Sequence, residues 1–238
     1  MMSRGGTHRP LRRGGRRWAV GAVAFLSVFA LLAGCGTPEF RYVSNPDEKT
    51  YFKVPNAWHE IDSGAVDEGF SGSVNPDSAT AMIQKQLRWS SAFDAAEDPM
   101  PEHMTRIISS PDPVLYVTIR HQTPGEQDIT SFDAMRDFFL PVTANTRAQA
   151  EQAGVSLSGF ELLYDEVLKG DGGLHGVRIV FNYEFPTGVV HTFDQTAYSN
   201  QDSTILYFLL IRCTATCYRE RAVELDNIAT SFTVRSKA

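Results

Sequence analysis

The feature that most constrains the fold is the segment 205–211, Ile-Leu-Tyr-Phe-Leu-Leu-Ile, in which no residue is charged and none is a small polar residue. A strand with one face in water alternates apolar and polar residues, whereas a strand covered on both faces reads as a continuous apolar run. We therefore predict a central strand over 205–211, inside a sheet with packed layers on both of its faces.

The segments before this strand predict an antiparallel meander. Apolar residues alternate with polar ones over 114–121 and again over 177–185, which is typical of half-buried strands. Strands are also predicted over 160–168 and 189–198. Segments rich in Gly, Pro, Asn and Asp separate the later strands and favour tight turns, and they cover 169–173, 186–188 and 200–203.

The rest of the chain predicts further strands and helices. Two short strands flank Pro55, and alternation over 81–89 predicts another half-buried strand, after a Gly-, Ser- and Asp-rich loop over 62–79. Ser131, or Thr130 before it, is a candidate N-cap for a helix that Pro141 interrupts and that ends near Gly154. Apolar residues recur at helical spacing over 214–230, which predicts a closing amphipathic helix.

The N-terminal residues resemble a bacterial lipoprotein signal. Residues 1–17 carry six arginines and no acid, residues 18–32 are almost wholly apolar, and Leu32-Ala33-Gly34-Cys35 matches the lipobox. A single transmembrane helix is the alternative, but the apolar run is at the short limit for spanning. The resemblance predicts cleavage between Gly34 and Cys35, and lipid attached to Cys35 as a firm membrane anchor.

This signal predicts the division of the chain and its location. We expect a signal peptide over 1–34, a tether over 35–48 and a single α+β domain over 49–238, held on the outer face of the cytoplasmic membrane. General secretion is favoured over twin-arginine export, because Gly15 precedes the arginine pair where Ser or Thr is usual.

The charge excludes one class of partner. The whole chain has a formal charge of −6, and the predicted signal takes six arginines and no acid with it, which leaves −12. Nucleic-acid binding needs a basic surface, so it is not expected. An anionic lipid leaflet would also repel such a domain, and we expect it to stand away from the membrane.

Two cysteines remain after the anchor, and they are four positions apart. In an exported protein, Cys213 and Cys217 are predicted to form a disulfide, with two free buried thiols as the alternative. Their spacing, with no accompanying histidine or further cysteine, disfavours zinc. The acidic loop over 93–110 is read as a solvated surface, with calcium binding as the less favoured reading because the EF-hand spacing is missing.

The sequence carries no motif of a known catalytic centre. The histidines are scattered, and no nucleophile elbow, Walker loop or dinucleotide-binding motif occurs. We therefore predict a protein that is not an enzyme, with no cofactor and no metal.

Core and corner residues near both ends of the predicted domain resemble the PsbP-like fold. They are Phe52, Val54, Pro55, Trp58, Ile228, Ser231, Phe232 and Val234. The resemblance covers about residues 49–235 and implies an antiparallel sheet between helices, an α/β/α sandwich. It also implies a role in assembly, binding or protein contact. The photosynthetic role of the family's photosystem subunit is not carried over.

Two functional hypotheses follow. The first is a tethered, non-catalytic module that binds an envelope protein or a cell-wall polymer. The second is a carrier or sensor of a small apolar ligand, or less favourably a hydrolase. It predicts a pocket between sheet and helix that is lined by surplus aromatic residues. These residues are Phe132, Phe138, Phe139 and Tyr183, and the alternative is that they only fill the core.

Overall fold

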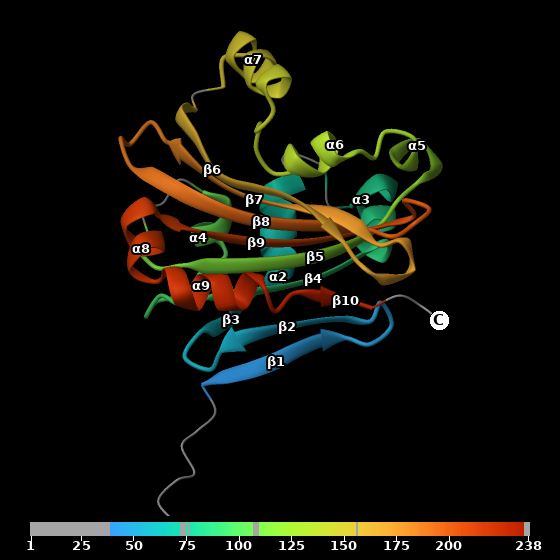
Figure 1. Cartoon of the computed structure of the whole chain (residues 1–238), viewed down its shortest axis with the longest axis horizontal. Helices are drawn as coiled ribbons and strands as arrows, with labels where there is room; N and C mark the ends of the chain where they lie inside the picture. Colours follow the sequence, from blue (N-terminus) through green and yellow to red (C-terminus); the bar gives the residue numbers. More distant parts are fainter. Residues whose placement is uncertain (1–38, 72–74, 76, 107–109, 156, 236–238) are drawn as a thin grey trace, which may run out of the picture. The chain divides into compact units, whose positions relative to one another are not determined.

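The computed structural model describes residues 39–71, 75, 77–106, 110–155 and 157–235. The predicted signal peptide, its cleavage site and the lipid anchor at Cys35 lie outside the described residues. Figure 1 shows antiparallel strands with helices on both sides. The predicted α+β class, an antiparallel sheet flanked by helices, is confirmed.

The described residues form strands, α-helices and one 3₁₀ turn, most of them short. The strands are β1 (Phe40–Asn45), β2 (Thr50–Pro55), β3 (His59–Ile61), β4 (Arg88–Asp94), β5 (Val114–His121), β6 (Ser158–Lys169), β7 (His175–Glu184), β8 (Val190–Ser199), β9 (Ile205–Thr214) and β10 (Thr233–Val234). The helices are α2 (Ser63–Ser71), α3 (Ala79–Gln86), α4 (Glu102–Thr105), α5 (Pro124–Gln127), α6 (Phe132–Arg136), α7 (Ala144–Gln152), α8 (Ala215–Glu220) and α9 (Ala222–Ala229), with a 3₁₀ turn at Asp171–Gly173.

Seven strands form the large sheet, in the order β3-β4-β5-β9-β8-β7-β6. The apolar strand β9 lies between β5 and β8 and is buried at every position from Ile205 to Cys213. Its two sets of side chains belong to different cores. Leu209 and Ile211 pack on one face, and Phe208 and Leu210 pack on the other. The predicted central strand is therefore confirmed, and it separates two hydrophobic layers.

A small sheet and the last helix cover one face. The small sheet has the order β1-β2-β10, and its strand β2 carries Phe52 and Val54 into a core shared with Trp58 and with Leu225 of α9. The predicted tether is wrong in this region. Residues 40–45 form β1 and pair with the whole of β2, and Phe40 and Val43 of this segment pack against that core.

Helices α2, α3 and α6 lie on the opposite face of the large sheet, with α5 beside α6 and α7 farther out (Figure 1). Two predictions in this region are wrong. Part of the expected loop over 62–79 is helix α2, and residues 81–86 of the expected strand belong to α3. The hydroxyl of Ser78 accepts a hydrogen bond from the amide of Ala81 and caps α3, so the strand β4 begins only at Arg88.

The closing helix and the cysteine pair also differ from the prediction. Arg221 has a non-helical backbone and divides the expected helix into α8 and α9. Cys213 and Cys217 are free, buried thiols, so the predicted disulfide is wrong. The turn between β9 and α8 is instead closed by the hydroxyl of Thr214, which accepts a hydrogen bond from the Cys217 amide. The hydrogen bond between the Cys213 thiol and Cys217, and then burial, raise the pKa of Cys213.

The strand β6 forms one edge of the large sheet. Among the described strands only β7 pairs with it, and most of its residues are exposed. It carries four exposed apolar side chains, namely Leu162, Leu163, Tyr164 and Val167. Two irregularities in its pairing with β7 interrupt the register, one before Glu161 and one at Leu163. No helix in the described part of the chain is long and apolar enough to span a membrane.

Candidate functional site

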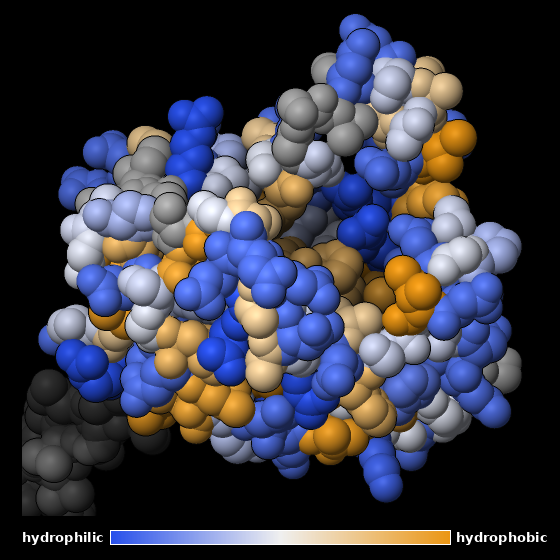
Figure 2. Space-filling model, turned by 90° about the horizontal axis from the view of Figure 1, so that it is seen from above, coloured by the Kyte–Doolittle hydropathy of each residue, from blue (hydrophilic) through white to orange (hydrophobic). Residues whose placement is uncertain are grey.

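A cavity of about 240 Å³ opens on the helical face of the large sheet, between the strands β4 and β5 and the segments α2, α3 and α6–α7. Figure 2 looks onto the side where α6 and α7 lie and shows a hollow with both apolar and hydrophilic surface around it. The residues that line the cavity are Phe70, Ser71, Gln84, Arg88, Tyr116, Thr118, Arg120, Phe138 and Phe139. We call this cavity the sheet pocket.

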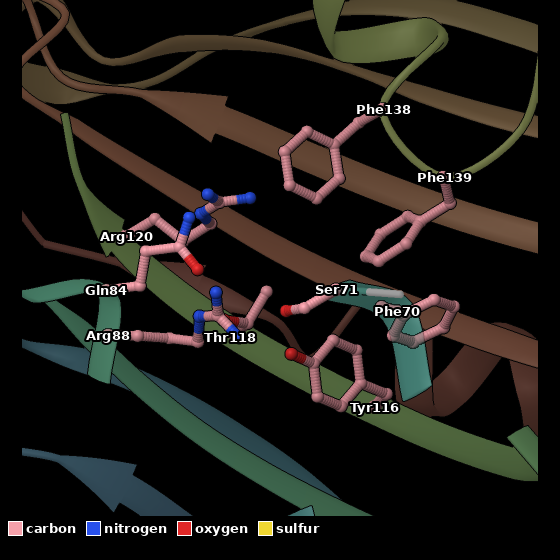
Figure 3. Close-up of a pocket in the computed structure, with 9 residues that line it drawn as sticks. All are labelled: Phe70, Ser71, Gln84, Arg88, Tyr116, Thr118, Arg120, Phe138 and Phe139. Carbon is pink, nitrogen blue, oxygen red and sulfur yellow. The ribbon is translucent and has the colours of Figure 1, made fainter. Parts of the chain in front are cut away.

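The floor of the sheet pocket follows from strand geometry. Side chains at alternate positions of a strand share one face, so Tyr116, Thr118 and Arg120 of β5 all point toward the helices. On the neighbouring strand β4, Arg88 lies directly opposite Arg120 in the register. The pairing of two strands therefore brings two guanidinium groups together at one end of the pocket, as Figure 3 shows.

The loop between α6 and α7 positions the aromatic side of the pocket. The carboxylate of Asp137 accepts hydrogen bonds from the amides of Val142 and Thr143, both at 2.7 Å. Burial works against the charged form, but these hydrogen bonds prevail and lower the pKa of Asp137. The closed loop holds Phe138 stacked on Phe208 of β9, with ring centroids 3.8 Å apart.

Aromatic rings form the side of the pocket opposite the arginines (Figure 3). Phe70 lies 5.4 Å from Tyr116 and 5.2 Å from Phe139, measured between ring centroids. The guanidinium of Arg120 lies 5.2 Å from the centroid of Phe138, within the range of a cation–π interaction. One cavity thus combines a cationic end with an apolar, aromatic end.

Carboxylates of the protein neutralise the charges of Arg88 and Arg120 only weakly. Like charges directly opposite one another on neighbouring strands are destabilising. Arg88 lies 3.5 Å from an oxygen of Asp67, and Arg120 lies 4.0 Å from an oxygen of Glu126. Burial, and then the charge of Arg88, lower the pKa of Arg120. The pocket therefore holds two partly buried cations that repel each other.

The nearby carboxylates are already engaged elsewhere. Asp67 accepts hydrogen bonds from the hydroxyls of Tyr116 and Ser90, the latter at 2.8 Å. Glu126 accepts from the amide and the hydroxyl of Thr123, at 2.8 and 2.7 Å, in a capping box at the start of α5. Burial, and then the negative charge of Asp67, raise the pKa of Tyr116, so its hydroxyl stays protonated.

One polar atom of the floor has no hydrogen bond of regular geometry among the described residues. Thr118 is 1% exposed, and its hydroxyl oxygen has no partner of regular hydrogen-bond geometry among the described residues. The Thr118 hydroxyl lies near the Tyr116 hydroxyl. This contact lowers the pKa of Tyr116, but by less than burial and Asp67 raise it. Buried hydroxyls are normally hydrogen-bonded, so an unpartnered one in a pocket floor is a position where a ligand atom would be stabilised.

A second hollow of about 370 Å³ adjoins the sheet pocket and shares Gln84 and Arg120 with it. It lies between α3 and α5 and includes Ile83 and Leu87. The side chains of α3 are not buried, and Met82 and Ile83 are more than half exposed. The wall that α3 contributes is therefore lightly packed.

The structure brings together two of the four aromatic residues that the sequence suggests for a pocket. Phe138 and Phe139 line the sheet pocket, whereas Phe132 packs against His175 and the hydroxyl of Tyr183 donates to the carbonyl of Pro141. Sequence reasoning missed the cationic end. The available signal was the polar face of 114–121, where Thr118 and Arg120 alternate with apolar residues.

The acidic loop over 93–110 shows an internal arrangement of hydrogen bonds. Asp94 is fully buried, and its carboxylate accepts from the amides of Ala96 and Met100 at 2.9 and 3.0 Å. Its second oxygen lies 2.6 Å from Nδ1 of His103. Within the described residues, no group of three acidic, histidine or cysteine side chains is placed to hold a metal ion. Asp94 therefore organises this loop through protein contacts.

No protein-family model and no curated protein matches the sequence. The fold is similar to that of several solved structures. Cyanobacterial PsbP from Synechocystis sp. PCC 6803 matches 85% of this chain and 96% of its own, with 15% identity and a TM-score of 0.49. LpqN of Mycobacterium tuberculosis, described as involved in cell envelope biogenesis, matches 84% of this chain and 87% of its own, with 12% identity and a TM-score of 0.41.

A third similar structure is the Ran-binding protein Mog1p of Saccharomyces cerevisiae, at 7% identity and a TM-score of 0.41 over 82% of this chain and 95% of its own. A PsbP structure is thus among those that resemble this chain. Similarity at this level transfers no partner, ligand or activity from any of these proteins.

Proposed function

We propose that this chain is a non-catalytic binding module, tethered to the outer face of the cytoplasmic membrane through lipid on Cys35, and that it holds a small, largely apolar ligand in the sheet pocket. The observation that supports ligand binding most directly is the set of four aromatic rings around one open cavity. Small-molecule sites are typically concave and lined by apolar and aromatic side chains with a few convergent polar groups.

The lining favours binding over chemistry. None of the described residues that line the pocket is a histidine, cysteine, aspartate or glutamate. Acid–base and nucleophilic catalysis rely on a group that titrates near the working pH or on an activated nucleophile. The hydroxyl of Tyr116 is held in its protonated form by burial and by Asp67. The pocket therefore offers shape, aromatic contact and positive charge, but no catalytic pair.

A second candidate function is contact with an envelope protein or a cell-wall polymer. The exposed apolar residues of the edge strand β6 favour it, because an unpaired edge can accept an extended segment of another chain. The two functions are compatible, since β6 and the β4–β5 floor of the pocket lie on opposite sides of β9 in the strand order.

The ligand-binding proposal is tested with a dye and a matched pair of variants. The uncharged dye N-phenyl-1-naphthylamine is titrated into the full chain, and saturable fluorescence enhancement is the expected result. Phe70 and Phe132 are similarly exposed, at 40% and 37%, but only Phe70 lines the pocket. Phe70→Ser is expected to weaken dye binding about tenfold, because it removes apolar surface that the bound dye would cover. Phe132→Ser is expected to leave dye binding unchanged.

Two outcomes contradict the proposal. One is dye binding that does not saturate, and the other is an equal loss of affinity in both phenylalanine variants. Native mass spectrometry of the purified protein provides an independent readout, because a retained small molecule would appear as a discrete mass difference.

A further inference from the structure

We infer that the ligand of the sheet pocket carries one anionic group, of carboxylate or phosphate chemistry, which Arg88 and Arg120 bind together. This inference rests on the proposed function, because it names the chemical class of the ligand for the same site. The inference depends on the two arginines at the cationic end of the cavity and not on the aromatic side.

The placement of the two arginines is the first observation. They lie opposite each other on β4 and β5 and line the same cavity (Figure 3). Their side chains are 12% and 26% exposed, so water screens their repulsion only in part. An oxyanion between two guanidinium groups converts this repulsion into charge-assisted hydrogen bonds, and the planar fork of arginine suits carboxylate and phosphate oxygens.

The second observation is that each arginine has only one, long ion pair with a carboxylate of the protein among the described residues. The carboxylate nearest to Arg120 is at 4.0 Å, beyond normal hydrogen-bond distance, and it accepts two shorter bonds from Thr123. Asp67 is 3.5 Å from Arg88 and is occupied by two hydroxyl donors. Among the described residues, both ion pairs at the cationic end of the cavity are thus longer than a normal charge-assisted hydrogen bond.

The third observation is the Thr118 hydroxyl in the floor, two positions before Arg120 on the same face of β5. It is almost completely buried and has no regular hydrogen-bond partner among the described residues. A hydroxyl donates to an anionic oxygen as readily as an amide does, and a bond to a charged group is the stronger kind. The amide of Gln84 reaches the same end of the cavity (Figure 3).

The neighbouring aromatic rings define the rest of the ligand. Phe138 lies under the guanidinium of Arg120, and Phe70, Tyr116 and Phe139 continue the apolar wall. The anionic group therefore sits at the end of an apolar or aromatic body. A molecule with several negative charges is disfavoured, because Asp67 and Glu126 remain close behind the arginines.

The test compares two dyes with nearly the same ring system. One is 1-anilinonaphthalene-8-sulfonate, which carries a single anionic group, and the other is the uncharged N-phenyl-1-naphthylamine. The full chain is expected to bind the anionic dye at least about tenfold more tightly, since a hydrogen bond to a charged group commonly supplies that factor. The preference is expected to shrink as salt concentration rises.

The arginine variants locate the preference. Arg120→Gln and Arg88→Gln are each expected to reduce affinity for the anionic dye about tenfold, with little change for the uncharged dye. Arg120→Lys keeps the charge but loses the fork and is expected to fall between the two. Arg219 is exposed on α8, away from the pocket lining, so Arg219→Gln is the control. The melting temperature of each variant verifies folding. If Arg88→Gln does not fold, the comparison of Arg120→Gln with Arg120→Lys still tests whether an arginine binds the anionic group.

Competition identifies the anionic chemistry. Phenylacetate and phenyl phosphate are each expected to displace the anionic dye, and the stronger competitor shows whether a carboxylate or a phosphate ester fits better. Displacement by inorganic phosphate alone, at the same concentration as by phenyl phosphate, would indicate an ion site without an apolar subsite and overturn the inference.

The outcomes separate this inference from the proposed function. Equal affinity for the two dyes, or a preference that survives both glutamine variants, overturns the anionic ligand and leaves the apolar pocket intact. Failure of both dyes to bind contradicts the proposed function itself.

Discussion

At the scale of single residues, the surroundings of His191 fix its charge. It is 2% exposed on β8, with the ring of Phe185 5.3 Å away and the cation Arg212 nearby. Burial, and then repulsion by Arg212, lower its pKa to about 4. The folded state therefore holds this imidazole neutral, whereas the unfolded chain protonates it near its ordinary pKa of about 6.5.

This difference predicts an acid-sensitive fold. Between about pH 6.5 and pH 4 the unfolded state binds more protons than the folded state, so stability falls as the pH falls through that window. The contribution of His191 is on the order of 3 kcal/mol, present in full above pH 6.5. Urea unfolding at a series of pH values measures it. His191→Asn is expected to flatten the curve in this window, and an unchanged curve would contradict the assignment.

Thr118 illustrates a trade of stability against binding. Its buried hydroxyl has no regular hydrogen bond among the described residues, and removal of such a group with retention of shape is neutral or stabilising. Thr118→Val is therefore expected to raise the free energy of unfolding by about 1 kcal/mol, while it weakens binding of the anionic dye.

A matched control comes from Thr196, whose hydroxyl is also buried and unpartnered among the described residues but which does not line the sheet pocket. Thr196→Val is expected to gain similar stability with no change in dye binding. Loss of dye affinity in both variants would show that the effect of Thr118→Val is not local.

At the scale of elements, the contact between β7 and β8 depends on a residue without a side chain. A Cβ atom at Gly176 would lie 2.0 Å from the carbonyl oxygen of Ala197 on β8. The two backbones could not keep this approach with any larger residue, because the oxygen belongs to the paired strand and cannot rotate away.

Gly176→Ala is therefore expected to cost more than about 3 kcal/mol of unfolding free energy, the range of severe core changes. Gly125 in α5 has open space around its own Cβ position. Gly125→Ala is expected to be neutral or to gain up to about 1 kcal/mol, since it restricts the unfolded chain. Chemical denaturation of both variants measures the contrast, and a similar cost at both positions would rule out the steric explanation.

The elements also show where sequence patterns are ambiguous. The segment 81–89 contains too few residues to separate a period of two from a period of 3.6, and Ile83 and Leu87 fit either. The N-cap Ser78 settles the backbone as helix. By contrast, Ser131 is both predicted and observed as the N-cap of α6, where its hydroxyl accepts from the amide of Ala134 at 3.0 Å.

At the scale of the whole molecule, the sequence predicted the central strand, the meander and the α+β class, because hydrophobic periodicity and turn residues are local. It predicted the site only in part. Phe138 and Phe139 were found as surplus aromatics in one segment. The meeting of Arg88 with Arg120 depends on the register between β4 and β5, and a pattern within one segment does not determine pairing between two.

Attachment to the membrane belongs to the same scale and remains a proposal. Cys35→Ala is expected to abolish labelling by radioactive palmitate and to leave the precursor uncleaved, because the predicted signal needs this cysteine for both lipid attachment and cleavage. Immunoblots of membrane and soluble fractions measure the size and location of the product. Cys213→Ala is the control, since that thiol is buried in the fold, and processed, membrane-retained material from the Cys35 variant would contradict the anchor.

The irregular pairing between β6 and β7 affects how readily neighbouring copies of the protein could associate through their edge strands. Copies held on one surface encounter each other far more often than they would in dilute solution, and a flat, uncharged outer strand would let them polymerise. Here the kinks near Glu161 and Leu163 break the geometric match between two such strands. Exposed acids at Glu161 and Glu166 repel their counterparts on a neighbour. The same strand thus discourages fibre growth and leaves its apolar side chains to a partner of opposite charge.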